Sequence, residues 1–117
     1  MIKGIGLDVT EIERIASANR RTTKFVERIL TAREMERWAT LSESRKLEFL
    51  AGRFAAKEAF SKAMGTGIGK SCSFQDIEVL ANESGKPLLY FKGEEVNGYI
   101  SITHTKQFAA AQVILVE

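Results

Sequence analysis

Apolar and polar positions alternate over the first residues, Met1 to Asp8, and this period of two is typical of a β-strand. Ile5, Leu7 and Val9 share one face of the expected strand. The other face carries two glycines and Asp8. Glycines on one face leave room for a close neighbour, so we expect another strand or a ligand to approach there.

Apolar residues then recur at helical spacing, and two sequence patterns mark where helices begin. Thr10 and Glu13 match a capping box, in which two side chains satisfy backbone N–H groups at a helix start. Thr31 and Glu34 match the same pattern. Between them, Lys24 to Leu30 carries apolar residues on one helical face, which predicts a further short helix.

The longest predicted helix begins at Ser42 or Ser44 and runs to about Met64. Three glycines within the next five residues end it, because glycine is costly inside a helix. Four short strands are expected in the remainder: Phe74 to Leu80, Leu88 to Lys92, Gly98 to Thr103 and Phe108 to Val116. This order predicts an α+β fold, in which a mainly antiparallel sheet packs with the long central helix and the shorter N-terminal helices.

Composition indicates one soluble domain over residues 1–117. Hydrophobic residues make up 44% of the chain and charged residues 27%, which is ordinary for a globular protein. No run approaches the ~20 apolar residues that cross a membrane, and the first residues lack a signal-peptide pattern. Cys72 is the single cysteine, so we expect a reduced thiol in a cytoplasmic protein.

Charge is divided unevenly along the chain. Residues 1–70 hold 14 lysines and arginines against nine acids, whereas residues 71–117 hold three against six. A basic segment with interleaved apolar residues contributes much of this excess: Arg14, Arg20, Arg21, Lys24, Phe25, Val26, Arg28 and Ile29. Such a segment is either a solvated helix face or a docking surface for an acidic amphipathic helix. Aromatic residues are too few here to favour nucleic acid.

The long helix contains one unexpected charge. Leu47, Ala51 and Phe54 form an apolar stripe, and Glu58 occupies the next position on it. Asp8 is a second carboxylate in an apolar setting. An unpaired buried charge is costly, so Glu58 would pair with a cation and Asp8 would cap a turn. Alternatively, the two together would hold Mg²⁺, which takes one or two carboxylates plus phosphate oxygens.

Two further residues have both a plain and a chemical interpretation. Lys62 follows Glu58 by four residues, so it is either a surface salt-bridge partner or a cation beside a metal-bound phosphate. His104, the only histidine, ends a strand that carries two hydroxyl side chains. It is either a polar turn residue or part of a phosphate-binding group. The glycine-rich segment 65–69 lacks the P-loop pattern, so it is a helix stop or a weak phosphate motif.

Together these segments resemble the holo-acyl-carrier-protein synthase family of phosphopantetheinyl transferases. The first motif is Gly4-Ile5-Gly6-Leu7-Asp8, and the second is Phe54-Ala55-Ala56-Lys57-Glu58-Ala59-Phe60-Ser61-Lys62-Ala63. Residues 48–53, the glycine segment 65–69 and Ser101-Ile102-Thr103-His104 are also similar to family members. The two motifs in this order and at this distance are specific, and the resemblance spans nearly the whole chain. It implies the 4′-phosphopantetheinyl transferase fold.

The resemblance also implies roles for individual residues. Asp8 and Glu58 would bind Mg²⁺, with Mn²⁺ as the alternative ion. Lys62 would stabilise the diphosphate of the co-substrate coenzyme A or protonate the leaving group. A further set would contact coenzyme A: Arg45, Arg53, Lys57, Ser61, Gly65, His104 and Thr105. A carrier protein would dock on Arg14, Arg21, Lys24, Phe25 and Arg28.

Finally, the resemblance implies a reaction and an assembly. The family moves 4′-phosphopantetheine from coenzyme A onto a serine of an acidic, helical apo-acyl-carrier protein. The other product is adenosine 3′,5′-bisphosphate, and the reaction supports fatty acid biosynthesis. Members of this length form homotrimers with active sites between subunits.

Two other classes of protein remain open on the residues alone. A non-catalytic adaptor that binds an acidic helix through residues 14–28 would explain the charge asymmetry. It would leave Asp8 and Glu58 as costly structural groups. An RNA-binding domain would not be expected to have an acidic second half.

Overall fold

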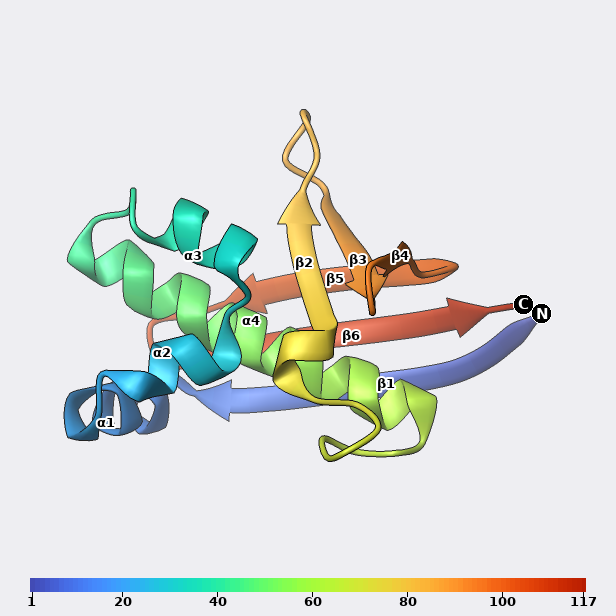
Figure 1. The fold of residues 1–117 in the computed structure, drawn as a ribbon, viewed down its shortest axis with the longest axis horizontal. Coiled ribbons are helices and arrows are strands. Elements are labelled where there is room, and N and C mark those ends of the chain that lie inside the picture. The colour runs from blue at the N-terminus through green and yellow to red at the C-terminus, as the bar shows by residue number, and fades with distance from the viewer.

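An antiparallel sheet and the long helix that crosses it form the centre of the molecule (Figure 1). The computed structural model describes all residues 1–117. The strand order of the sheet is β1-β6-β5, and its strands are β1 (Ile2–Glu11), β6 (Phe108–Val116) and β5 (Gly98–His104). Helix α4 (Glu43–Met64) packs on the inner face of this sheet. The two chain ends lie side by side (Figure 1), and the Glu117 N–H donates to the Met1 carbonyl.

A smaller sheet of order β2-β3-β4 follows α4 along the chain. Its strands are β2 (Ile77–Ala81), β3 (Pro87–Phe91) and β4 (Glu94–Glu95). The sequence predicted one strand from Phe74 to Leu80, but a 3-10 turn, η1 (Phe74–Asp76), precedes β2. The turn forms because the side chains of Ser73 and Asp76 each accept from the other's backbone N–H. The other three predicted strands match β3, β5 and β6 within about one residue at each end, which confirms the α+β class.

Three short helices lie beside the start of α4 (Figure 1): α1 (Ile12–Arg21), α2 (Lys24–Ile29) and α3 (Ala32–Trp38). The capping box predicted at Thr31 and Glu34 is confirmed. Ser42 caps α4 by accepting from the Arg45 N–H. The helix ends at Gly65, whose φ of 81° lies in the left-handed region that favours glycine. No helix of the chain combines the length and hydropathy needed to cross a membrane.

The capping box predicted at Thr10 and Glu13 is wrong, because Thr10 is still part of β1. Helix α1 begins after Glu11, and no side chain caps it. The Thr10 hydroxyl instead donates to Oδ2 of Asp8 at 2.6 Å. The residue that was expected to begin a helix therefore orients a candidate site residue.

β1 and α4 approach closely because two glycines of β1 face the helix. A Cβ atom at Gly6 would collide with the carbonyl oxygen of Ala59. A Cβ atom at Gly4 would collide with the carbonyl oxygen of Ala63. The close neighbour expected on this face is therefore the α4 backbone, and Asp8 follows the glycines on the same face.

The outer face of the β1-β6-β5 sheet is apolar and uncovered. Ile5, Leu7 and Val9 of β1 are 57%, 57% and 62% exposed, and Tyr99 of β5 is 62% exposed. Ile114 of β6 lies between Ile5 and Tyr99 in the strand register. Contiguous apolar surface of this kind marks an interaction site in soluble proteins.

The buried core is divided between two clusters. In one, α4 packs between the two sheets. In the other, α1 and α2 pack on the first half of α4. The division places the basic segment of α1 and α2 at one end of α4, and the glycine contacts with β1 toward the other.

Candidate functional site

The Asp8 carboxylate of β1 is held by two neighbouring side chains. Its Oδ2 accepts from Thr10 Oγ1 at 2.6 Å, and its Oδ1 accepts from Lys62 Nζ at 3.2 Å. The Lys62 ammonium also donates to the Leu7 carbonyl at 3.1 Å. The side chain of Asp8 is 14% exposed and that of Lys62 is 51% exposed. Lys62 therefore neutralises Asp8 and remains open to solvent on one side.

Glu58 lies one helical turn before Lys62 on α4, and it forms no ion pair. Burial, and then the nearby Asp8 charge, raise the pKa of Glu58, while Lys62 lowers it in part. The salt bridge between Glu58 and Lys62 that the spacing allowed is absent, because Lys62 pairs with Asp8. A structural ion pair therefore does not account for Glu58.

The two carboxylates fit a divalent cation that takes its remaining ligands from other molecules. The Asp8 charge is close enough to raise the pKa of Glu58, and a cation between the two would relieve this repulsion. No group of three or more histidine, cysteine or acidic side chains forms here or elsewhere in the chain. Mg²⁺ commonly uses one or two carboxylates with water and substrate phosphates, so the donor set suits that ion.

A cavity of about 250 Å³ on the other side of α4 gathers three of the predicted residues, Arg45, Arg53 and His104. His104 Nε2 lies 3.5 Å from Glu48 Oε2. The Arg53 guanidinium lies over the Phe49 ring at 4.2 Å, and its buried Nε has no partner. Burial lowers the pKa of Arg53. Three arginines and one glutamate line this cavity, and this excess of positive charge favours an anion there.

Asp8 and His104 lie on opposite edges of the central sheet. β1 and β5 both pair with β6, in which Ala111 is the partner of Asp8 and Ala109 is the partner of His104. Two strand spacings, about 10 Å, separate the edges, and α4 covers the inner face between them (Figure 1). The predicted site residues therefore form two separate groups. The first is Asp8, Glu58 and Lys62, and the second is Arg45, Arg53 and His104.

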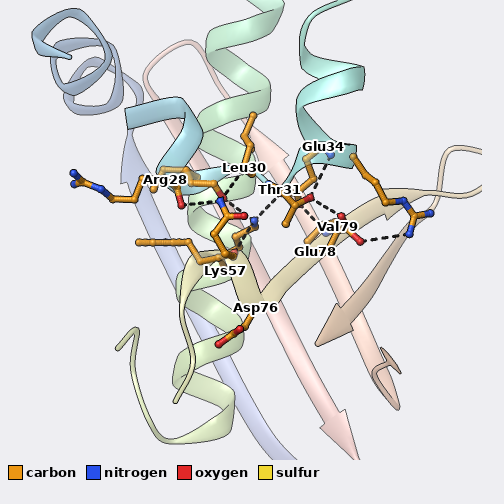
Figure 2. Close-up of polar contacts among 12 residues, drawn as sticks. Arg28, Leu30, Thr31, Glu34, Lys57, Asp76, Glu78 and Val79 are labelled. Carbon is orange, nitrogen blue, oxygen red and sulfur yellow. Dashed lines mark hydrogen bonds and ion pairs between the residues drawn. The ribbon is translucent and has the colours of Figure 1, made fainter. Parts of the chain in front are cut away.

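Lys57 belongs to neither group, and its predicted contact with coenzyme A is wrong. No part of Lys57 is exposed. Its ammonium donates to the Ile29 carbonyl at 2.7 Å, to Glu34 Oε1 at 2.6 Å and to the Phe74 carbonyl at 3.0 Å (Figure 2). An ammonium has three donors, and these contacts use all of them. No donor remains for a phosphate.

The other predicted coenzyme A contacts are distributed along α4 and the β5–β6 turn. Ser61 is fully buried, and its hydroxyl donates to the Glu58 carbonyl at 2.7 Å, so the structure does not bring it to the surface. Gly65 is exposed one turn after Ser61, at the end of α4. Thr105 is exposed, and its hydroxyl accepts from the Phe108 N–H at 3.0 Å. The turn containing Thr105 directly follows His104.

The predicted docking residues gather on α1 and α2 around a cavity of about 200 Å³. Three of them line it: Arg14, Arg21 and Phe25. Lys24 and Arg28 are exposed on α2. Thr10 lines the same cavity and donates to Asp8. The basic surface therefore begins beside the Asp8 carboxylate.

Sequence reasoning missed two charged residues of the His104 cavity, Arg37 and Glu48. The place of Glu48 could have been predicted from the sequence, because Glu48 shares one helical face with Arg45 and Gly52 through the spacing i, i+3 and i+7. Arg37 comes from α3, a different helix. No local pattern places it beside His104.

Comparisons with known proteins point to one family. A family model described as the 4′-phosphopantetheinyl transferase superfamily matches residues 4–114. The chain is 59% identical over 116 residues to the holo-[acyl-carrier-protein] synthase of Bacillus subtilis (strain 168). That match covers 98% of this chain and 96% of the relative.

Solved structures give the same result. The chain is similar to the holo-(acyl-carrier-protein) synthase from Bacillus anthracis str. Ames in complex with CoA (3′,5′-ADP), with a TM-score of 0.88 and 51% identity. The match covers 98% of this chain and 96% of that one. The chain is also similar to the Helicobacter pylori holo-[acyl-carrier-protein] synthase in complex with coenzyme A, with a TM-score of 0.81 and 34% identity. That match covers 97% of this chain and 99% of the Helicobacter pylori chain.

Proposed function

The chain belongs to the 4′-phosphopantetheinyl transferase superfamily, and from this membership we propose that it transfers 4′-phosphopantetheine from coenzyme A to a serine of an apo-acyl-carrier protein. The products would be the holo-carrier protein and adenosine 3′,5′-bisphosphate, in support of fatty acid biosynthesis in the cytoplasm. The observation that carries the proposal is the Glu58 carboxylate, which lies beside the Asp8–Lys62 pair without a cation of its own. The two similar proteins solved with coenzyme A or its nucleotide portion support the donor.

Asp8 and Glu58 would hold the metal ion, Mg²⁺ or alternatively Mn²⁺. When bound, the ion would neutralise negative charge on the coenzyme A diphosphate and polarise its phosphoryl oxygens. Thr10 keeps the Asp8 carboxylate in a fixed orientation through its hydroxyl. Lys62 already contacts Asp8 and is half exposed, so its ammonium would reach a diphosphate oxygen from the solvent side.

The side chains would act mainly by positioning and by neutralising charge, which supply most of the rate in phosphoryl transfer. The carrier serine oxygen would attack the β-phosphorus in line, and the bond from that phosphorus to the bridging oxygen would break. The electron pair would leave with adenosine 3′,5′-bisphosphate, and Lys62 would stabilise or protonate that oxygen. Glu58, or a water that it orients, would accept the serine proton.

We further propose that the site is completed between subunits of a homotrimer. The residues that would bind the coenzyme A phosphates are Arg45, Arg53, His104 and Thr105. His104 and Thr105 lie at the end of β5, and the two arginines of α4 share a cavity with His104, whereas Asp8 lies on the β1 edge. A cyclic trimer would cover the apolar outer face of the β1-β6-β5 sheet and bring the β5 edge of one subunit to the β1 edge of the next. One coenzyme A would then contact both groups.

An acidic, helical carrier protein would dock on α1 and α2. The residues that would receive it are Arg14, Arg21, Lys24, Phe25 and Arg28. Opposite charges on the two surfaces would orient the encounter. Because the docking cavity begins at Thr10 beside Asp8, the carrier serine would arrive next to the metal-binding carboxylates.

Mass spectrometry of the carrier tests the proposed reaction. The chain is incubated with an apo-acyl-carrier protein, coenzyme A and Mg²⁺, and the carrier should gain the mass of one phosphopantetheine group. A carrier whose acceptor serine is replaced by alanine should gain nothing. EDTA, Asp8→Ala and Glu58→Ala should each leave the carrier in its apo form. Absence of the mass gain with cognate carriers would contradict the transferase proposal, and a gain that resists EDTA would contradict the metal.

A further inference from the structure

Helix α2 (Lys24–Ile29) has only 6 residues and would not be stable in isolation. The last carbonyls of such a helix have no partners within it. The side-chain amide of Gln75, in η1, donates to the carbonyls of Glu27 at 2.7 Å and Leu30 at 2.8 Å. It makes a longer contact with the Arg28 carbonyl at 3.3 Å. One side chain from a distant segment therefore closes the end of α2.

The remaining carbonyl of that turn is bound by Lys57. Its Nζ donates to the Ile29 carbonyl at 2.7 Å and to the Phe74 carbonyl of η1 at 3.0 Å. A cation suits this place, because the C-terminus of a helix carries partial negative charge. Lys57 thus joins α2 and η1 to α4 at the position directly before Glu58.

A row of aromatic rings makes the same connection. Phe74 of η1 stacks on Phe54 of α4 with ring centroids 5.4 Å apart, and Phe54 meets Phe25 of α2 at 6.4 Å. Phe25 and Phe54 also line the docking cavity. The η1 turn therefore supports α2 by polar and apolar contacts, although none of its residues belongs to the proposed site.

We propose that η1 positions α2 for recognition of the carrier protein, and that Gln75 is a positioning residue in this step. The inference rests on the proposed docking of a carrier on α1 and α2. Lys24, Phe25 and Arg28 present a fixed surface only if α2 keeps one place relative to the carboxylates. Gln75 contacts no residue proposed to bind the metal or coenzyme A. Its removal should therefore affect the carrier and spare coenzyme A.

Gln75 can be substituted without opening the core, because it is exposed. Gln75→Met keeps the length of the side chain and removes its donor, and Gln75→Ala removes both. Asn97→Ala is a matched control. The exposed Asn97 amide also donates to a backbone carbonyl, that of Glu117, at 2.8 Å, but it has no contact with α2.

Steady-state kinetics with an apo-acyl-carrier protein, coenzyme A and Mg²⁺ tests the inference, with each substrate varied in turn. Gln75→Met and Gln75→Ala should raise KM for the carrier about three- to tenfold, given the usual net value of a hydrogen bond. Their kcat at saturating carrier and their KM for coenzyme A should stay within about twofold of wild type. Hydrogen exchange at the α2 amides should be faster in both variants and unchanged in Asn97→Ala.

Arg28→Ala in the same assay tests the docking surface directly, so a failure of the Gln75 inference can be distinguished from a failure of the proposed docking surface. If Arg28→Ala raises KM for the carrier and neither Gln75 variant does, the docking surface stands and the positioning role of Gln75 is wrong. If no variant changes KM for the carrier, the carrier does not dock on α1 and α2, and the positioning role of Gln75 is then wrong as well. Equal rises in the KM of both substrates would also overturn it, because they would indicate general loosening of the fold.

Discussion

The Lys57 ammonium lies 2.6 Å from the Glu34 carboxylate, and neither side chain is exposed to solvent (Figure 2). The same carboxylate accepts from the backbone N–H groups of Thr31 at 2.9 Å and Val79 at 2.8 Å. The pair therefore connects α3, α4 and β2. Replacing a whole buried ion pair by apolar residues can be neutral, but removing one partner is severe because the other charge stays buried and unpaired.

Lys57→Met should lower the free energy of unfolding by about 3–5 kcal/mol. The variant keeps an unbranched side chain but leaves the Glu34 carboxylate without its cation. Urea unfolding of both proteins at equal protein concentration measures the loss. The double variant Lys57→Met/Glu34→Gln should recover part of it, since no unpaired charge is then left in the core. The recovery should be incomplete, because the single amide oxygen can replace only one of the two carboxylate oxygens that accept from Thr31 and Val79. Wild-type stability combined with weaker binding of coenzyme A would instead support Lys57 as a phosphate ligand.

Ionisation of the Glu58 carboxyl should lower the stability of the metal-free protein as pH rises. Burial and the Asp8 charge raise the pKa of Glu58 above its ordinary value of 4.5, so the folded chain holds this proton to a higher pH than the unfolded chain does. Its favourable contribution is complete below the unfolded pKa and is lost as pH rises through the folded pKa. Glu58→Gln should therefore be more stable than wild type above this window, and thermal unfolding in EDTA across pH 4–8 measures the difference.

Mg²⁺ should reverse that order of stability. An ion that binds only the folded state stabilises it, so added Mg²⁺ should raise the melting temperature of wild type and leave Glu58→Gln unchanged. Glu43→Gln is the matched control, because it makes the same chemical change at a side chain that is 95% exposed. If Glu58→Gln and Glu43→Gln behave alike in EDTA and in Mg²⁺, Glu58 is not the metal-binding carboxylate.

Local rules predicted much of the fold, and long-range pairing decided the rest. The capping box at Thr31 and the glycines after Met64 act within one turn, so the sequence placed both helix ends correctly. The same box at Thr10 failed because β1 continues to pair with β6 as far as Glu11, opposite Phe108. That pairing joins the two ends of the chain, and no local pattern reveals it.

The part of the site that lies on α4 could be predicted from helical geometry, because that geometry determines which side chains share a face with Glu58. Lys57 and Lys62 both flank Glu58 in the sequence, but Lys62 lies one turn away on nearly the same side. Lys57 shares its side with Phe60 and Ser61, which are buried, so the helical period already separates the two lysines. The partner of Lys57 comes from α3, 23 residues away, and only the tertiary fold supplies it.

Gly6→Ala should destabilise the chain by more than about 3 kcal/mol, beyond the usual cost of overpacking. The new methyl group would collide with the Ala59 carbonyl oxygen, and backbone on both sides leaves it no room to move. Gly69→Ala is the matched control, since a Cβ atom there meets nothing within 4 Å and φ is not positive. Urea unfolding of both variants measures the difference. Similar stabilities would mean that β1 and α4 can separate without cost.

Two inactive variants should complement one another if neighbouring subunits share each active site. Asp8→Ala removes the group on the β1 edge, and Arg45→Ala/His104→Ala removes the group on the β5 edge. An equal mixture, unfolded and refolded together, should restore about a quarter of wild-type activity, because that share of random subunit contacts joins two intact edges. Each variant refolded alone is the control. A mixture no more active than the mean of the two would place the whole site within one subunit.

Arg21 and Arg20 end helix α1 side by side, but they face different surroundings. Arg21 lines the docking cavity, whereas Arg20 pairs with Glu13 at 2.9 Å and lines another cavity. Arg21→Ala should raise KM for an acidic carrier about two- to fivefold at low salt, as expected for a charge at the rim of an interface. Arg20→Ala should have almost no effect on it, and neither variant should change KM for coenzyme A.

The effect of Arg21→Ala should also fade as KCl is added. The Debye length falls from about 10 Å at 0.1 M to about 3 Å at 1 M, so the attraction that the arginine provides is screened in wild type as well. The KM for the carrier should therefore converge for wild type and Arg21→Ala at high salt, while kcat stays the same. A difference that persists at 1 M KCl would show that Arg21 contacts the carrier through packing or a desolvated hydrogen bond and not through long-range charge.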